Sequence, residues 1–141
     1  MGGIALSRLA LQFQLTAPDG PLKNNWQRLL GIAADFQLVV DHRVLWSEAH
    51  FPVVELARQL SIWLTRASNL EPFAYASLES DVPGLVRFEP RPSGWAVSSA
   101  YQVHPSPTAF STSELCTAVR EFVQRVRESV QQAHGFDPLQ G

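Results

Sequence analysis

Residues 34–67 read ADFQLVVDHRVLWSEAHFPVVELARQLSIWLTRA, and a change of period inside this stretch indicates the fold class. Apolar side chains alternate from Ala34 to Val40 and again around Leu45, on either side of a short polar break at 41–43. Alternation is typical of half-buried strands, and the break predicts a hairpin. From Pro52 onward the apolar residues follow helical spacing instead. We therefore expect a β-hairpin that leads directly into a helix.

The helix predicted after this hairpin begins at Pro52 and stops near Asn69, because proline suits the first helical position and asparagine a helix end. Its apolar stripe contains Val53, Leu56, Ala57, Leu60, Trp63, Leu64 and Ala67. The polar side contains Glu55, Arg58, Gln59, Thr65 and Arg66. Ile62 is the exception, since it lies opposite Val53 on the helical wheel, in the middle of the polar side.

The chain before the hairpin predicts one strand and a long connection. Leucine and phenylalanine alternate with polar residues from Leu9 to Leu15, which indicates a half-buried strand. Turn residues follow at 18–21, and residues 24–30 are long enough for a helical turn or two. We expect Trp26 to hold this connection against the body of the domain.

The second half of the chain repeats the order of strands followed by a helix. Three apolar runs at 72–78, 85–89 and 95–103, separated by two turn clusters, predict a meander. Ser111 and Glu114 have the spacing of a capping box, which predicts the start of a C-terminal helix that ends at Gly135. Its expected apolar stripe contains Leu115, Ala118, Val119, Phe122, Val126, Val130 and Ala133.

These patterns predict one α+β domain spanning residues 1–141, with elements in the order β-β-β-α-β-β-β-α. Two helices with a single apolar stripe each need a common surface, so we expect an antiparallel sheet of about six strands with both helices on one face. The other face is expected to be open, and its expected residues are Arg8, Gln12, Gln14, Asp35, Gln37, Ser98 and Gln102.

Composition narrows the class of protein. Apolar residues make up 45% of the 141 residues, which is typical of a globular chain. The formal charge of −2 argues against nucleic acid as a ligand. Because the chain has a single cysteine, no evident signal peptide and no apolar run of bilayer length, we expect a cytoplasmic protein without a membrane span. Arginine dominates the basic residues, which suggests a bacterial source.

The sequence offers little for catalysis. None of the four histidines has another histidine or cysteine at metal-site spacing, no serine lies in a nucleophile turn, and no glycines have phosphate-loop spacing. Cys116 falls at the edge of the last helix's apolar stripe, so a buried thiol is the expected state. We therefore predict no catalytic residues, no metal and no cofactor.

The candidate partner-binding residues are Ile62, Arg58, Arg66, Glu79 and Asp81. An apolar side chain among arginines has a composition that is enriched in binding hot spots. The two carboxylates lie in a turn that is able to meet a basic surface.

The stretch Phe51 to Ala57 and then Ile62-Trp63-Leu64 follows a hairpin and precedes a meander and a terminal helix. In this plan the chain resembles small uncharacterised bacterial domains and immunity proteins of polymorphic or contact-delivered toxin systems. The resemblance covers the order of elements over most of the chain. It implies a cytosolic binder that neutralises a toxin by direct contact, and it transfers no individual residue.

Our main hypothesis is therefore a non-enzymatic protein-binding module, a monomer or weak homodimer, of the immunity type. A second hypothesis is a small enzyme or ligand-binding domain whose pocket between sheet and helices is lined by Trp46, Trp63, Trp95, Tyr75 and Tyr101. A third is a structural homodimer joined through sheet edges or faces. A neighbouring toxin gene would favour the first hypothesis and a metabolic operon the second.

Overall fold

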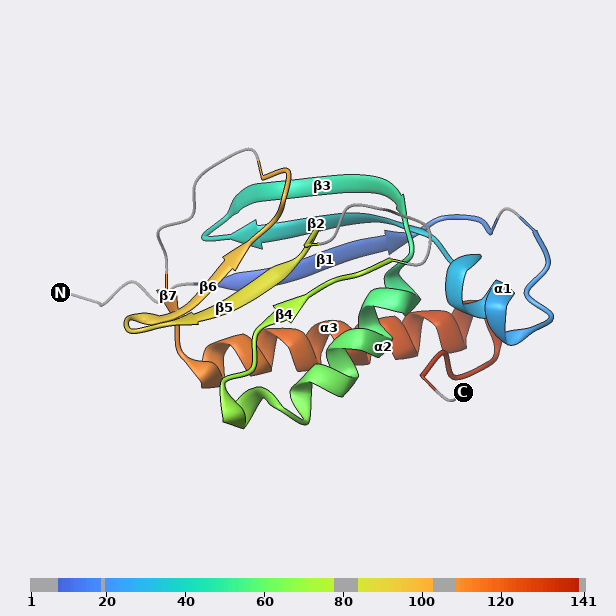
Figure 1. The fold of residues 1–141 in the computed structure, drawn as a ribbon. Helices are drawn as coiled ribbons and strands as arrows, with labels where there is room; N and C mark the ends of the chain where they lie inside the picture. The colour runs from blue at the N-terminus through green and yellow to red at the C-terminus, as the bar shows by residue number, and fades with distance from the viewer. Residues whose placement is uncertain (1–7, 19, 78–83, 103–108, 140–141) are drawn as a thin grey trace, which may run out of the picture.

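A computed structural model describes residues 8–18, 20–77, 84–102 and 109–139. Within these ranges the chain forms seven strands, three α-helices and one 3-10 turn (Figure 1). In chain order they are β1 (Leu9–Leu15), α1 (Asn25–Leu30), β2 (Ala34–Val40), β3 (Arg43–Phe51), α2 (Val53–Leu64), η1 (Ala67–Asn69), β4 (Phe73–Ala74), β5 (Arg87–Arg91), β6 (Gly94–Ser98), β7 (Ala109–Phe110) and α3 (Thr112–His134).

The strands form two antiparallel sheets, with the orders β1-β2-β3 and β4-β5-β6-β7. Both long helices lie below the strands in Figure 1. The α+β class and the antiparallel pairing are confirmed. The expectation of one sheet with about six strands is wrong. Among the described residues the β2–β3 hairpin pairs only with β1, and the meander forms its own sheet with the unpredicted strand β7. At two residues, β7 is too short to give an alternation pattern.

The first sheet places its apolar residues on one face through a regular register. Leu11 pairs with Leu38, and Phe13 pairs with Phe36. Between β2 and β3 the register shifts after Leu38, and a shift of this kind rotates the side chains that follow. Leu45 and Trp46 are therefore both buried, although strict alternation predicts opposite faces for them.

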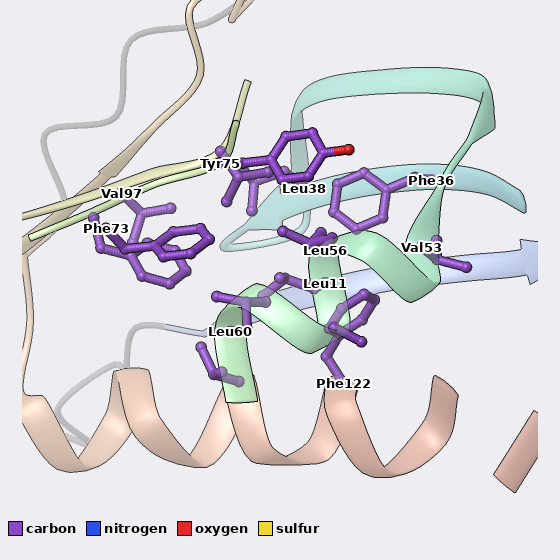
Figure 2. Packing of buried hydrophobic residues seen from close by; sticks show 14 of the residues in the cluster. Leu11, Phe36, Leu38, Val53, Leu56, Leu60, Phe73, Tyr75, Val97 and Phe122 are labelled. Carbon is purple, nitrogen blue, oxygen red and sulfur yellow. The ribbon is translucent and has the colours of Figure 1, made fainter. Parts of the chain in front are cut away.

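One core joins the two sheets to α2 and α3. Figure 2 shows Leu11 and Phe36 of the first sheet, Leu56 and Leu60 of α2, and Phe122 of α3 directed into the same cluster. The rings of Trp63 and Trp95 meet edge to face, with centroids 5.6 Å apart, and so connect α2 to the second sheet. Edge-to-face contact is a favoured arrangement of aromatic pairs.

The predicted helix ends are largely confirmed. Ser111 and Glu114 form the capping box at the start of α3, and Gly135 ends this helix in the left-handed conformation, with φ of 77°. α2 ends at Leu64, before the expected stop, and the chain continues as the 3-10 turn η1. Ala133 was expected in the buried stripe of α3 but is exposed, because the stripe ends at Val130.

The expected contact of Trp26 with the body of the domain is wrong. Trp26 is 60% exposed, and α1 buries none of its residues, so this tryptophan does not hold the connection against the domain.

The outer face of the first sheet is open as predicted, since Gln12, Gln14, Asp35 and Gln37 are exposed. On the second sheet, however, Ser98 and Gln102 are half-buried, and the amide oxygen of Gln102 accepts a hydrogen bond from the backbone of Ser99.

Candidate functional site

The polar side of α2 is mostly occupied by contacts within the protein. Glu55, expected to be exposed, is only 3% exposed, and its carboxylate accepts a hydrogen bond from the Tyr75 hydroxyl. One turn later the amide of Gln59 donates to the carbonyl of Ala76 and accepts from its N–H. The segment that follows β4 therefore covers the first half of α2 on the side of Glu55 and Gln59, in addition to the side that faces the core. A single apolar stripe in the sequence predicts burial of one side only.

Ile62 differs from these polar neighbours. Its side chain is 57% exposed, whereas Leu60 and Trp63 beside it are 0% and 4% exposed. The expectation that Ile62 faces outward is confirmed. Single exposed apolar residues are common on protein surfaces. Whether Ile62 is a candidate binding residue therefore depends on the residues around it.

The C-terminal segment forms the other side of this region. Nε of Arg58 donates a hydrogen bond of 2.8 Å to the carbonyl of Pro138, which attaches the segment to α2. Arg58, Ser61, Ile62 and Leu139 together line a hollow of about 200 Å³. We call these four residues the Ile62 surface.

An ion pair fixes the position of Leu139. Nε and one terminal nitrogen of Arg127 each lie 2.9 Å from Oδ2 of Asp137, while Oδ1 of Asp137 accepts the N–H of Leu139. The hydrogen bond and positive charge of Arg127 hold the pKa of the Asp137 carboxyl below its ordinary value. The same contact raises the pKa of Arg127. The ionised pair therefore helps to hold Leu139 in its place in the Ile62 surface.

The remaining candidates are not brought together in the same way. Arg66 is exposed but lies beyond the end of α2, where helical spacing no longer relates it to Ile62. Glu79 and Asp81 fall outside the described residues. Arg58 and Ile62 are thus the two predicted residues that meet at one hollow.

The aromatic residues proposed to line an internal pocket pack together instead. Trp46, Trp63, Trp95 and Tyr75 are each at most 5% exposed, and their rings contact other core rings. The indole N–H groups of Trp63 and Trp95 donate to the carbonyl of Glu71 and the hydroxyl of Thr112. Tyr101 is 59% exposed and does not join them, because β6 ends at Ser98. The expectation that these five side chains line one pocket is wrong.

Other side chains with potential chemistry are dispersed. Among the described residues, no three His, Cys, Asp or Glu side chains gather closely enough to hold a metal ion. Cys116 is free and buried, as predicted. No helix in the described ranges is long and apolar enough to span a membrane.

Sequence reasoning missed the contribution of the C-terminal segment to the Ile62 surface. Phe136 and Leu139 follow the end of α3 closely. Two apolar residues after a helix end were the feature of the sequence that could have indicated packing of this segment against the domain. Both are partly buried against the core, and the guanidinium of Arg28 lies 4.4 Å from the centroid of the Phe136 ring.

The fold and the site together define an α+β domain with a small apolar and basic surface on α2. The chain belongs to the family described as Domain of unknown function (DUF7878), whose model matches residues 11–132. No curated protein and no solved structure matches it.

Proposed function

We propose that this protein is a non-enzymatic binding module that contacts a protein partner through the Ile62 surface. The observation that carries the proposal is the 57% exposure of Ile62 beside a hollow of about 200 Å³. Neighbouring polar residues of α2 bind backbone groups of the chain, whereas this apolar side chain is left facing solvent. An apolar residue next to a hollow and an arginine suits a small interface anchor.

The chemistry of the surface suggests what the partner presents. The hollow accepts an apolar side chain, and Arg58, which lines it, favours a carboxylate at its rim. Charge pairs at an interface rim mainly affect the association rate and selectivity.

A narrower form of the proposal is an immunity protein in a bacterial cytoplasm that occludes a toxin. The resemblance in the order of elements supports this form. The proposed toxin need not be bound by α2 alone, because the sequence also nominates Glu79 and Asp81 as acidic contacts for a basic patch.

The test is affinity capture from the source organism with three versions of the protein: wild type, Ile62→Asp and Tyr101→Asp. Tyr101 is a matched control, since it is exposed to the same degree as Ile62 but follows the second sheet. The proposal predicts a partner that is retained by wild type and Tyr101→Asp and lost with Ile62→Asp. Equal capture by all three folded proteins, or no stoichiometric partner, would remove the Ile62 surface as a binding site.

A further inference from the structure

Residues 136–139 cross from the end of α3 to the other two helices, and we call them the 136–139 strap. Gly135 ends α3 in the left-handed conformation, which turns the chain away from the helix axis. In Figure 1 the strap is the red segment that follows α3 and lies below α1. The hydrogen bond between Arg58 and the Pro138 carbonyl places the strap against α2 as well.

Each of the three helices holds the strap through one arginine. The guanidinium of Arg28 in α1 lies 4.4 Å from the centroid of the Phe136 ring, which is within the range of a cation–π contact. Arg127 of α3 pairs with Asp137, and Arg58 of α2 donates to the carbonyl of the next residue. Three successive residues of the strap are therefore held by three different helices.

The strap is attached to the body of the domain by side-chain contacts rather than by secondary structure. Among the described residues, no backbone-to-backbone hydrogen bond joins the strap to another element. Pro138 is buried, but Phe136 and Leu139 are only partly buried against the core. Segments without such backbone bonds and with few buried contacts open at a lower free energy than the whole domain unfolds. The strap can therefore detach while the sheets and α3 stay intact.

Detachment of the strap would change the Ile62 surface. Leu139 lines the hollow beside Ile62, so its departure would enlarge the hollow beyond about 200 Å³. Arg58 would lose the Pro138 carbonyl that accepts from its Nε, and this donor would become free to bind another acceptor. The attached strap thus occupies part of the surface that we propose for the partner.

The charges around the strap favour an acidic partner. Among the described residues, Arg28 and Arg58 form no ion pair, and Arg127 pairs only with Asp137. Three guanidinium groups thus meet one carboxylate, and a detached strap takes that carboxylate away. Arginine binds carboxylates well, because its planar set of donors matches their geometry. A partner segment with carboxylates and an apolar side chain would replace the contacts of Asp137 and Leu139.

We propose that the 136–139 strap closes over the Ile62 surface and opens as a unit to admit an acidic and apolar segment of the partner. This inference rests on the proposed function, since it concerns how the same surface becomes accessible. If only a fraction of the molecules is open, the apparent affinity is the intrinsic affinity reduced by that fraction. Variants that open the strap should therefore bind an acidic segment more tightly than wild type does.

The first experiment follows the strap by NMR in the isotopically labelled full chain. Asp137→Asn removes the ion pair with Arg127, and Glu121→Gln is the matched control, because it removes an equal charge from the ion pair with Arg125 within α3. In Asp137→Asn the order parameters of the strap amides should fall below about 0.6, while those of α3 stay near about 0.85. A strap that stays rigid, or a strap and α3 that loosen together, would overturn the proposal.

The second experiment titrates two blocked five-residue peptides into the same proteins, one alternating leucine with glutamate and the other alternating leucine with lysine. The glutamate peptide should bind Asp137→Asn at least about tenfold more tightly than wild type or Glu121→Gln, and more tightly than the lysine peptide. Equal affinity of the glutamate peptide for Asp137→Asn and Glu121→Gln would overturn the proposal, because net charge alone would then explain any gain. Absence of binding at millimolar peptide would overturn it as well.

Further variants show where the glutamate peptide binds. Adding Ile62→Asp to Asp137→Asn should weaken binding about tenfold or more, whereas adding Tyr101→Asp, with the same added charge, should leave it unchanged. Arg127→Gln provides a second way to open the strap but removes one of the three arginines, so it should bind the peptide about threefold more weakly than Asp137→Asn. Unchanged binding after the addition of Ile62→Asp would show that the peptide binds elsewhere, which contradicts the proposal.

Sedimentation of wild type tests the competing occupant. A concentration-dependent dimer that is lost with Asp137→Asn would show that two copies exchange their straps, and it would overturn the choice of an acidic partner. Failure of the strap experiments is distinguishable from failure of the proposed function. Partner capture with Ile62→Asp and Tyr101→Asp in the wild-type background decides the Ile62 surface separately.

Discussion

The hydroxyl of Tyr75 donates a hydrogen bond to the carboxylate of Glu55, and both side chains are buried in the core. This contact holds the segment after β4 against α2. Tyr75→Phe keeps the ring and removes one donor from a buried carboxylate, so we expect the free energy of unfolding to fall by about 1–3 kcal/mol. Chemical denaturation measures this loss. Tyr101→Phe, at an exposed ring, is the control and should change it by less than about 0.5 kcal/mol. Equal effects of the two variants would contradict the buried contact.

The ion pair between Arg127 and Asp137 predicts an acid-dependent contribution to stability. The folded-state pKa of Asp137 lies below its ordinary value of 3.8, so the contribution is complete above that value and is lost as the pH falls through the folded pKa. Asp137→Asn should lower the melting temperature at neutral pH, and the difference from wild type should shrink in acid below the ordinary pKa. The pKa of Arg127 is raised, so this side chain stays charged throughout the acidic range and contributes no pH dependence to stability there. A pH-independent difference in melting temperature would contradict the pair.

Replacing Arg87 with an apolar residue is expected to stabilise the fold. Its Nε is buried and finds no hydrogen-bond partner among the described residues, and its side chain lies so close to Gly84 that a Cβ there would be 2.7 Å from its Cδ. Arg87→Met keeps most of this packing and removes the unpaired donor, so the free energy of unfolding should rise by about 1 kcal/mol. Arg91→Met, at an exposed position, is the matched control. A clear loss of stability for Arg87→Met relative to that control would show that the guanidinium contributes to the fold.

Ile62→Asp should leave stability within about 0.5 kcal/mol of wild type, as is usual for exposed positions. Leu60→Asp, two residues earlier on the same helix, buries a carboxylate in the core and should lower the melting temperature severely. Thermal melts of both variants measure the difference. A similar collapse for Ile62→Asp would show that the side chain is part of the packing.

Local patterns predicted the elements well. The alternation of Leu9–Leu15 and the capping box at Ser111 depend on neighbours in sequence, and both features appear where expected. The position of Ile62 on the helical wheel also predicted its exposure. This prediction is correct because the core covers only one side of the second half of α2. The predicted order of elements was correct apart from the short strand β7 and the helix α1.

Contacts between distant segments were not predictable from the same patterns. Glu55 is buried because Tyr75 packs over it from another part of the chain. Leu139 reaches Ile62 because Arg127 holds Asp137 and Arg58 holds the Pro138 carbonyl. The division into two sheets has the same origin, since periodicity shows which residues form strands but not which strands pair.

The most direct test of binding through the Ile62 surface is a titration of the captured partner with wild type, Ile62→Asp and Tyr101→Asp. We expect Ile62→Asp to weaken binding by about 2 kcal/mol, or roughly thirtyfold in Kd, and Tyr101→Asp to bind as wild type does. If Ile62→Asp folds normally and binds with unchanged Kd, the Ile62 surface is not the contact and the proposed function through α2 is wrong.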